Sequence, residues 1–85
     1  MDVLVKFFVF DLPPGFEDAT FELKNGAVVN DVLEACLELF KQRGVSMDEN
    51  ELRTSTVIIN GKWSAVGAPV SSGDVINIIR PMDGG

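Results

Sequence analysis

The sequence places its clearest chemistry at the C-terminal end. It contains no histidine and a single cysteine, Cys36, and no serine stands in a nucleophile-elbow pattern. The remaining candidate is the terminal carboxylate that follows Gly84 and Gly85. A carboxylate becomes a good electrophile only after one oxygen is converted into a leaving group. Because glycine has no Cβ, such an end can pass through a narrow channel to reach a reaction partner. Chemistry at such an end would need activation from outside, because the chain offers no evident general base of its own.

The elements that would position this end form one domain, predicted over residues 1–80, with a flexible tail over 81–85. A helical period begins at Asn30, the predicted N-cap, and ends at Gly44. Residues 45–55 are predicted to form a loop with one short helical turn. Strands are predicted at 3–10, 19–23, 57–59, 62–63 and 75–79. This order predicts an α+β fold, with one main helix on one face of a mixed sheet of four to five strands.

Composition excludes several classes of function. The net charge of -6 argues against binding to nucleic acid and to anionic membranes, and it favours docking on a more basic protein. The unpaired Cys36 and the lack of a signal-peptide pattern indicate a reducing, cytoplasmic location. An iron–sulfur site is excluded because a cluster needs several cysteines.

The run from Gly73 to Gly85 resembles the C-terminus of the ubiquitin-like sulfur carriers. That family includes the small subunit of molybdopterin synthase and the sulfur carrier of thiamine biosynthesis. Its pattern is a Gly-Asp turn, an apolar strand, a proline, a short tail and a terminal Gly-Gly. Further matches lie at residues 7–8, 29–33 and 57–61, whereas Val75, Arg80 and Met82 depart from the molybdopterin-synthase pattern. The resemblance implies the ubiquitin-like β-grasp fold.

The resemblance also implies a function for the chain end. A ubiquitin-activating-type adenylyltransferase, using ATP and Mg²⁺, would join Gly85 to AMP, and a persulfide sulfur would then replace AMP to give a thiocarboxylate. Gly84 would help to thread the tail. A sulfur-accepting synthase subunit would take the sulfur in a molybdopterin-type pathway, with thiamine biosynthesis as the alternative. The carrier itself is expected to bind no cofactor and no metal and to have no catalytic activity.

The partner is expected to dock on the sheet face that the helix leaves uncovered. In an alternating first strand, Leu4, Phe8 and Phe10 flank Lys6 on that face, although the rings of Phe8 and Phe10 could instead pack under the Pro13-Pro14 loop. Other residues predicted to contact the partner, or considered for that role, are Ile76 or Ile78, Trp63, Arg80, Pro81 and Met82.

Two functions of other classes compete with the carrier. The chain could be a ubiquitin-like modifier joined to lysines through Gly85, or an interaction module that needs no terminal glycines. Cys36 is interpreted as a core residue because it lies on the apolar arc of the helix. The acidic run 48–51 is interpreted as a solvated loop rather than a cation site, because it lacks the glycine and the distant glutamate of a calcium loop.

Overall fold

The computed structural model describes residues 1–82. Five strands and two helices follow one another along the chain: β1 (Asp2–Phe8), β2 (Asp18–Glu22), α1 (Val29–Gln42), α2 (Glu49–Arg53), β3 (Thr56–Ile59), β4 (Lys62–Trp63) and β5 (Val75–Ile79). No helix in this part of the chain is long and apolar enough to span a bilayer.

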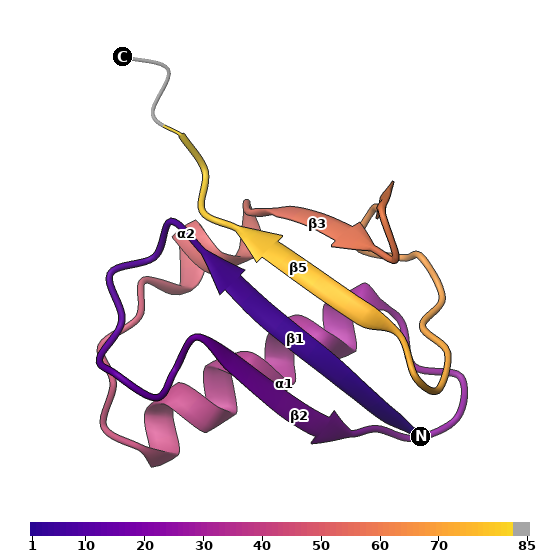
Figure 1. Ribbon diagram of the computed structural model, residues 1–85, viewed down its shortest axis with the longest axis horizontal. Helices are drawn as coiled ribbons and strands as arrows, with labels where there is room; N and C mark the ends of the chain where they lie inside the picture. Colours follow the sequence, from indigo (N-terminus) through magenta and orange to yellow (C-terminus); the bar gives the residue numbers. More distant parts are fainter. Residues whose placement is uncertain (83–85) are drawn as a thin grey trace.

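The strands form one sheet in the order β2-β1-β5-β3-β4. The two central strands, β1 and β5, run parallel, and the other neighbours are antiparallel. In Figure 1, α1 crosses behind the sheet and leaves its front face uncovered. This arrangement is a β-grasp fold, so the predicted mixed sheet with one main helix is confirmed.

The core lies between α1 and the inner face of the sheet, which we define as the face that α1 covers. Alternate residues of the two central strands point into it, because successive side chains of a strand face opposite ways. On the helix, the buried positions recur at spacings of three and four, as the predicted amphipathic pattern requires. The main members of this core are Val3, Val5, Val32, Leu33, Cys36, Phe40, Ile76 and Ile78.

The start of α1 differs from the prediction, because the N-cap is Val28 and not Asn30. Valine offers no side-chain acceptor, so the first-turn N–H groups are satisfied from elsewhere. Val29 donates to the carbonyl of Ala68, and Asn30 donates to the carbonyl of Val66. The Asp31 carboxylate also accepts from the Val28 N–H at 2.8 Å. A distant loop thus caps this helix, and local sequence carries no sign of it.

The end of α1 agrees with the prediction. The helix ends at Gln42, and Gly44 follows with φ of 68°, a left-handed conformation that glycine adopts at little cost. The chain then forms α2, where the sequence predicted a loop with one helical turn. Asp48 caps this short helix by accepting from the Glu51 N–H at 3.1 Å.

Strand β1 ends two residues earlier than predicted. Val9 has φ of 71°, so the alternation of inner and outer side chains breaks there. Phe10 is consequently turned toward the core, where its ring meets that of Phe7 edge to face, with centroids 6.2 Å apart. Phe10 therefore lies off the uncovered face, and only Phe8 of this predicted pair remains on it.

Candidate functional site

The candidate site is the region where β5 leaves the sheet. β5 is paired on both sides, with β1 and with β3, so its last residue, Ile79, is held firmly in the centre of the fold. Pro81 is half-buried and Met82 is 79% exposed. Gly84 and Gly85, the predicted reactive residues, lie outside the described residues.

Arg80 anchors the chain at this exit. Its backbone N–H donates to the carbonyl of Phe8 at 3.0 Å, which adds one hydrogen bond beyond the last residue of β5. Its guanidinium binds the carboxylate of Glu51 on α2, with Nε at 2.5 Å from Oε1 and Nη2 at 3.4 Å from Oε2. A planar guanidinium with two contacts to one carboxylate fixes direction as well as distance. Arg80, predicted to contact the partner, is thus engaged within the protein and aligns the start of the tail.

The opposite end of β5 is fixed by two turns that hydrogen-bond to each other. Asn60, at φ of 49°, accepts from the Val75 N–H through Oδ1 and donates through Nδ2 to Asp74. The other oxygen of Asp74 accepts from the Ser71 N–H at 2.7 Å. Asp74 is therefore a turn residue that fixes both neighbouring loops. β5 is therefore held at both ends, and the exit of the chain has a fixed place on the domain.

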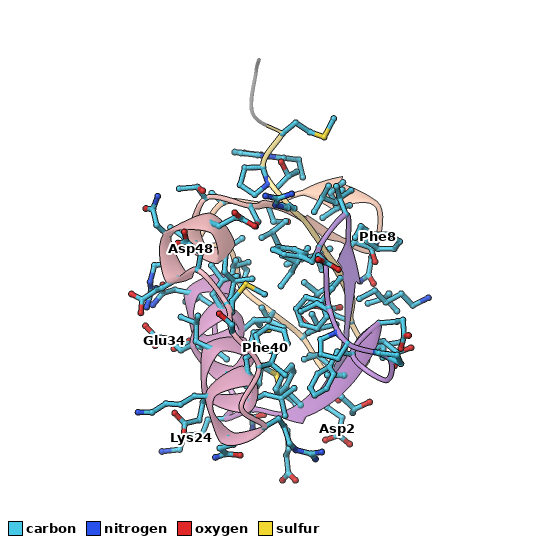
Figure 2. The ribbon with its side chains drawn as sticks, turned by 90° about the vertical axis from the view of Figure 1, so that its left-hand side faces the viewer. Asp2, Phe8, Lys24, Glu34, Phe40 and Asp48 are labelled. Carbon is cyan, nitrogen blue, oxygen red and sulfur yellow. The ribbon has the colours of Figure 1, made fainter. Side chains whose placement is uncertain are left out.

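Beside this exit lies an apolar surface, which we call the outer patch. It covers the face of the sheet that α1 leaves open, and Figure 2 shows Phe8 on that face, on the side of the sheet away from α1. Trp63 is 73% exposed and Phe8 is 43% exposed, so two aromatic side chains meet solvent here. The strand pairings align the members of the patch in neighbouring rows: Leu4, Phe8, Ile58, Trp63, Val75 and Ile79. Exposed apolar surface on this scale is typical of a site for another protein.

The last strand was assigned to the wrong face. Ile78 was predicted to contact the partner, but its side chain is fully buried in the core, as is that of Ile76. Their neighbours Val75, Asn77 and Ile79 occupy the outer face instead. Asn77 is the signal that sequence reasoning missed, because an amide in mid-strand marks the face toward solvent.

The remaining candidate residues have structural roles. Cys36 is fully buried, and its burial raises the pKa of the thiol from 9.0 to about 12, so it stays a neutral thiol at ordinary pH. The acidic run is occupied by its own contacts, since Asp48 caps α2, Glu49 pairs with Arg53, and Glu51 pairs with Arg80. Within residues 1–82, no three side chains of the metal-binding types are grouped closely enough to hold an ion.

Two features of the site had no sequence signal. The Glu51–Arg80 contact joins residues 29 apart, and nothing local marks either side chain for it. Asn77 Oδ1 is buried without a hydrogen-bond partner among residues 1–82, although it lies in the middle of the outer face between Lys6 and Ile58. Such an acceptor costs free energy unless something bonds to it.

No protein-family model and no curated protein sequence matches this chain. Solved structures do. A protein assigned as molybdopterin converting factor subunit 1 from Pyrococcus furiosus has a TM-score of 0.69 at 22% identity, over 96% of this chain and 99% of that chain. SAMP1, small archaeal modifier protein 1 from Haloferax volcanii, has a TM-score of 0.69 at 24% identity, over 100% of both chains.

A third similar chain comes from the complex of subunits 1 and 2 of the molybdopterin-converting factor from Helicobacter pylori 26695. Its TM-score is 0.56 at 20% identity, over 100% of both chains. Identities this low establish the shared fold and no more. The β-grasp fold implied by the resemblance is confirmed, whereas the sulfur chemistry at Gly85 stays a prediction.

Proposed function

We propose that this chain is a sulfur-carrier protein that works through a thiocarboxylate at Gly85, in the synthesis of a molybdopterin-type cofactor. The position of β5 carries this proposal. A central strand leads the chain out of the sheet from a fixed point, beside the exposed apolar side chains of the outer patch. The domain would dock by the patch while its end enters the partner's reaction centre.

The chemistry requires three steps, all of them carried out by partners. An oxygen of the Gly85 carboxylate attacks the α-phosphorus of ATP, and pyrophosphate leaves with Mg²⁺ stabilising its charge. The terminal sulfur of a persulfide then attacks the carbonyl carbon, and AMP leaves. A second thiol cleaves the resulting sulfur–sulfur bond, which leaves the thiocarboxylate on Gly85 and a disulfide on the donor side. The carrier supplies no general base in any of these steps.

The partners follow from the same scheme. A ubiquitin-activating-type adenylyltransferase would supply the ATP chemistry, and a synthase subunit would accept the sulfur. The assembly of subunits 1 and 2 in the Helicobacter pylori protein supports a partner of the second kind. The net charge of -6 suits encounter with a basic partner surface around the apolar centre.

A second function is supported by the similarity to small archaeal modifier protein 1. In that case the activated carboxyl carbon of Gly85 would be attacked by a lysine amine of a target protein. An isopeptide bond would form as AMP, or the activating enzyme's thiol, leaves. The two functions share the adenylation step and differ in the final acceptor.

The intact mass of the protein from its native cells tests the proposal. We expect a species heavier by one oxygen-to-sulfur exchange, mapped to Gly85 by fragmentation and abolished when residues 84–85 are deleted. Lysine adducts of the chain, without the thiocarboxylate, would replace the carrier by the modifier. An unmodified mass, even after incubation with a native-cell extract, ATP, Mg²⁺ and a persulfide donor, would contradict both.

The outer-patch variant Phe8→Ala provides a matched comparison with the deletion of residues 84–85. Its chain end is unchanged, so any loss of the modified species must come from docking. We expect the modified fraction to fall while the fold is retained, because Phe8 lies outside the core.

A further inference from the structure

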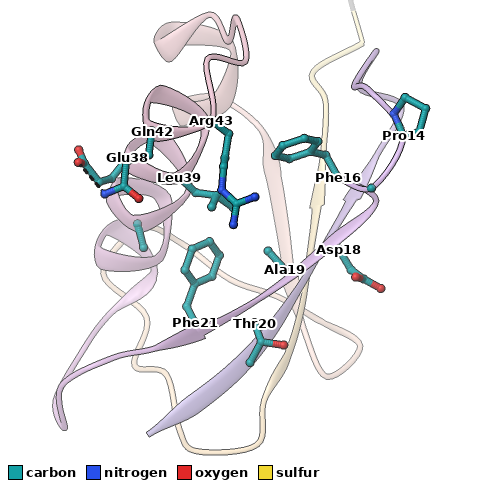
Figure 3. Close-up of a pocket in the computed structure, with 12 residues that line it drawn as sticks. Pro14, Phe16, Asp18, Ala19, Thr20, Phe21, Glu38, Leu39, Gln42 and Arg43 are labelled. Carbon is teal, nitrogen blue, oxygen red and sulfur yellow. Dashed lines mark hydrogen bonds between the residues drawn. The ribbon is translucent and has the colours of Figure 1, made fainter.

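A groove separates α1 from β2, on a side of the molecule that the proposed function does not use. Its volume is about 660 Å³, and strand, helix and the loop before β2 all contribute to its lining. Figure 3 shows Phe21 and Arg43 directed into this gap, whereas Asp18 and Thr20 point away from the helix. A groove that runs beside a strand edge can take an extended segment of chain.

The wall of the groove is an unpaired strand edge. β2 is the last strand on its side of the described sheet, and it is five residues long, whereas β4 on the opposite side has two. Met1 and Leu23 exchange both backbone hydrogen bonds, and Phe7 donates to Glu17. Because such pairs alternate in an antiparallel ladder, the odd-numbered residues of β2 bond to β1. The backbone N–H and C=O groups of Asp18, Thr20 and Glu22 therefore face outward.

The lining of the groove includes apolar side chains that are only partly covered. Ala19 and Phe21 of β2 are half-buried, and so are Ala35 and Leu39 of α1. Leu39 is absent from the side chains that pack against the core, although it belongs to the apolar arc of the helix. Leu39 lines the groove instead. Its side chain therefore contributes less to the core than its neighbours do, and a segment lying alongside β2 would cover it.

Charge favours one kind of segment. The outer-face side chains of β2 include Asp18 and Glu22, and Asp2 lies opposite Glu22 on β1. Lys6 stands opposite Asp18 and offsets part of this charge. The helix rim is mixed, with Glu38 hydrogen-bonded to Gln42, and with Arg43. On the outer face, a strand added to β2 would thus meet an acidic row, where cross-strand pairing with basic side chains is favourable.

We propose that the β2 edge and the α1–β2 groove bind an extended segment of a partner protein, in which basic residues alternate with apolar ones, as a sixth strand of the sheet. The apolar side chains fill the groove against Phe21 and Leu39, and the basic ones face Asp18 and Glu22. The backbone of the segment bonds to the outward groups of β2. Because β2 is separated from β5 by β1, the outer patch at Phe8 and Ile79 stays uncovered, so this site is independent of the proposed carrier function.

Titration of the full chain, labelled with ¹⁵N and ¹³C, with a capped seven-residue peptide of alternating lysine and valine tests the proposal by NMR. We expect shifts at the amides of Asp18, Thr20 and Glu22 and at the Leu39 methyl groups. In the double variant Asp18→Lys with Glu22→Lys, affinity for this peptide should fall by about tenfold or more, and a glutamate–valine peptide should bind better. Leu39→Gln should weaken both peptides without changing the midpoint of thermal unfolding.

Acidic side chains on an edge strand can also serve only to prevent pairing with other chains. That role predicts no binding of either peptide at millimolar concentration, which would overturn the proposal. Shifts at Phe8 and Ile79 instead of β2 would overturn it as well. So would concentration-dependent shifts of β2 amides without peptide, because they would make a second copy the occupant. A lysine–valine peptide methylated on alternate backbone nitrogens must lose the binding.

Discussion

The two faces of the sheet contain the same kinds of apolar residue, but one face is buried in the core and the other is exposed. On β5, Ile78 is fully buried under α1, while its neighbour Ile79 lies on the outer face beside Phe8. The inner residue is surrounded by core side chains, and the outer one is only half-covered. Hydrophobicity alone therefore does not separate residues that form the core from residues that form the outer patch. Position on the alternating strand does.

Replacing these neighbours one at a time gives the largest expected effect. Ile78→Ala should lower the free energy of unfolding by about 2–5 kcal/mol, because it leaves a cavity in a packed core. Ile79→Ala should lower it by about 1 kcal/mol or less. Urea unfolding followed by circular dichroism measures both. Only Ile79→Ala should reduce the thiocarboxylate fraction in cells while the protein remains folded. Equal losses of stability would contradict the division between the two faces.

The exclusion of water from the core can be tested through the ionisation of the Cys36 thiol. Because burial raises the pKa of this thiol from 9.0 to about 12, the unfolded chain loses the proton first as pH rises. Its contribution to stability is complete below about pH 9 and is lost progressively toward pH 12. The slope is at most about 1.4 kcal/mol per pH unit, which amounts to roughly 1–3 kcal/mol by pH 11.

Urea unfolding at several alkaline pH values checks this, with Cys36→Ala as the reference. The variant lacks the thiol, so its stability should fall less steeply between pH 9 and 11 even if it is lower at pH 7. Parallel slopes for the two proteins would show that water reaches the thiol in the folded state.

The smallest expected effect concerns Asn77 on the outer face. Its Oδ1 has no hydrogen-bond partner within residues 1–82 and is shielded from solvent. Asn77→Val removes this acceptor and introduces a residue that favours strands, so the free energy of unfolding should rise by about 1 kcal/mol. The shift of the urea midpoint measures it. A decrease would show that the Asn77 amide stabilises the isolated domain.

Much of the fold could be predicted because local patterns and the final structure agree. The alternation of β1 identifies Val3 and Val5 as core residues, and the helical period identifies the buried face of α1 as far as Gly44. These predictions need only the geometry of one element. The order of elements then leaves few arrangements in which the apolar face of the helix packs on one face of the sheet.

The errors arose where one element depends on another. The alternation of β1 cannot show that Val9 adopts a positive φ, so Phe10 was placed on the wrong face. The cap of α1 comes from the loop at 66–68, more than thirty residues along the chain, and so Asn30 was misread as the N-cap. For the site, the sequence indicated an apolar docking face. Its composition, Ile79 rather than Ile78, had to come from the structure.

The anchoring of Arg80 also limits how far from the domain the residues that follow it can reach. With the Arg80 backbone bonded to Phe8 and its guanidinium bonded to Glu51, extension can begin only at Pro81. Residues 81–85, even when fully extended, span roughly 18 Å at most. Under the proposed carrier function, a partner bound at the outer patch would have to hold the atoms that react with Gly85 within that distance of Arg80.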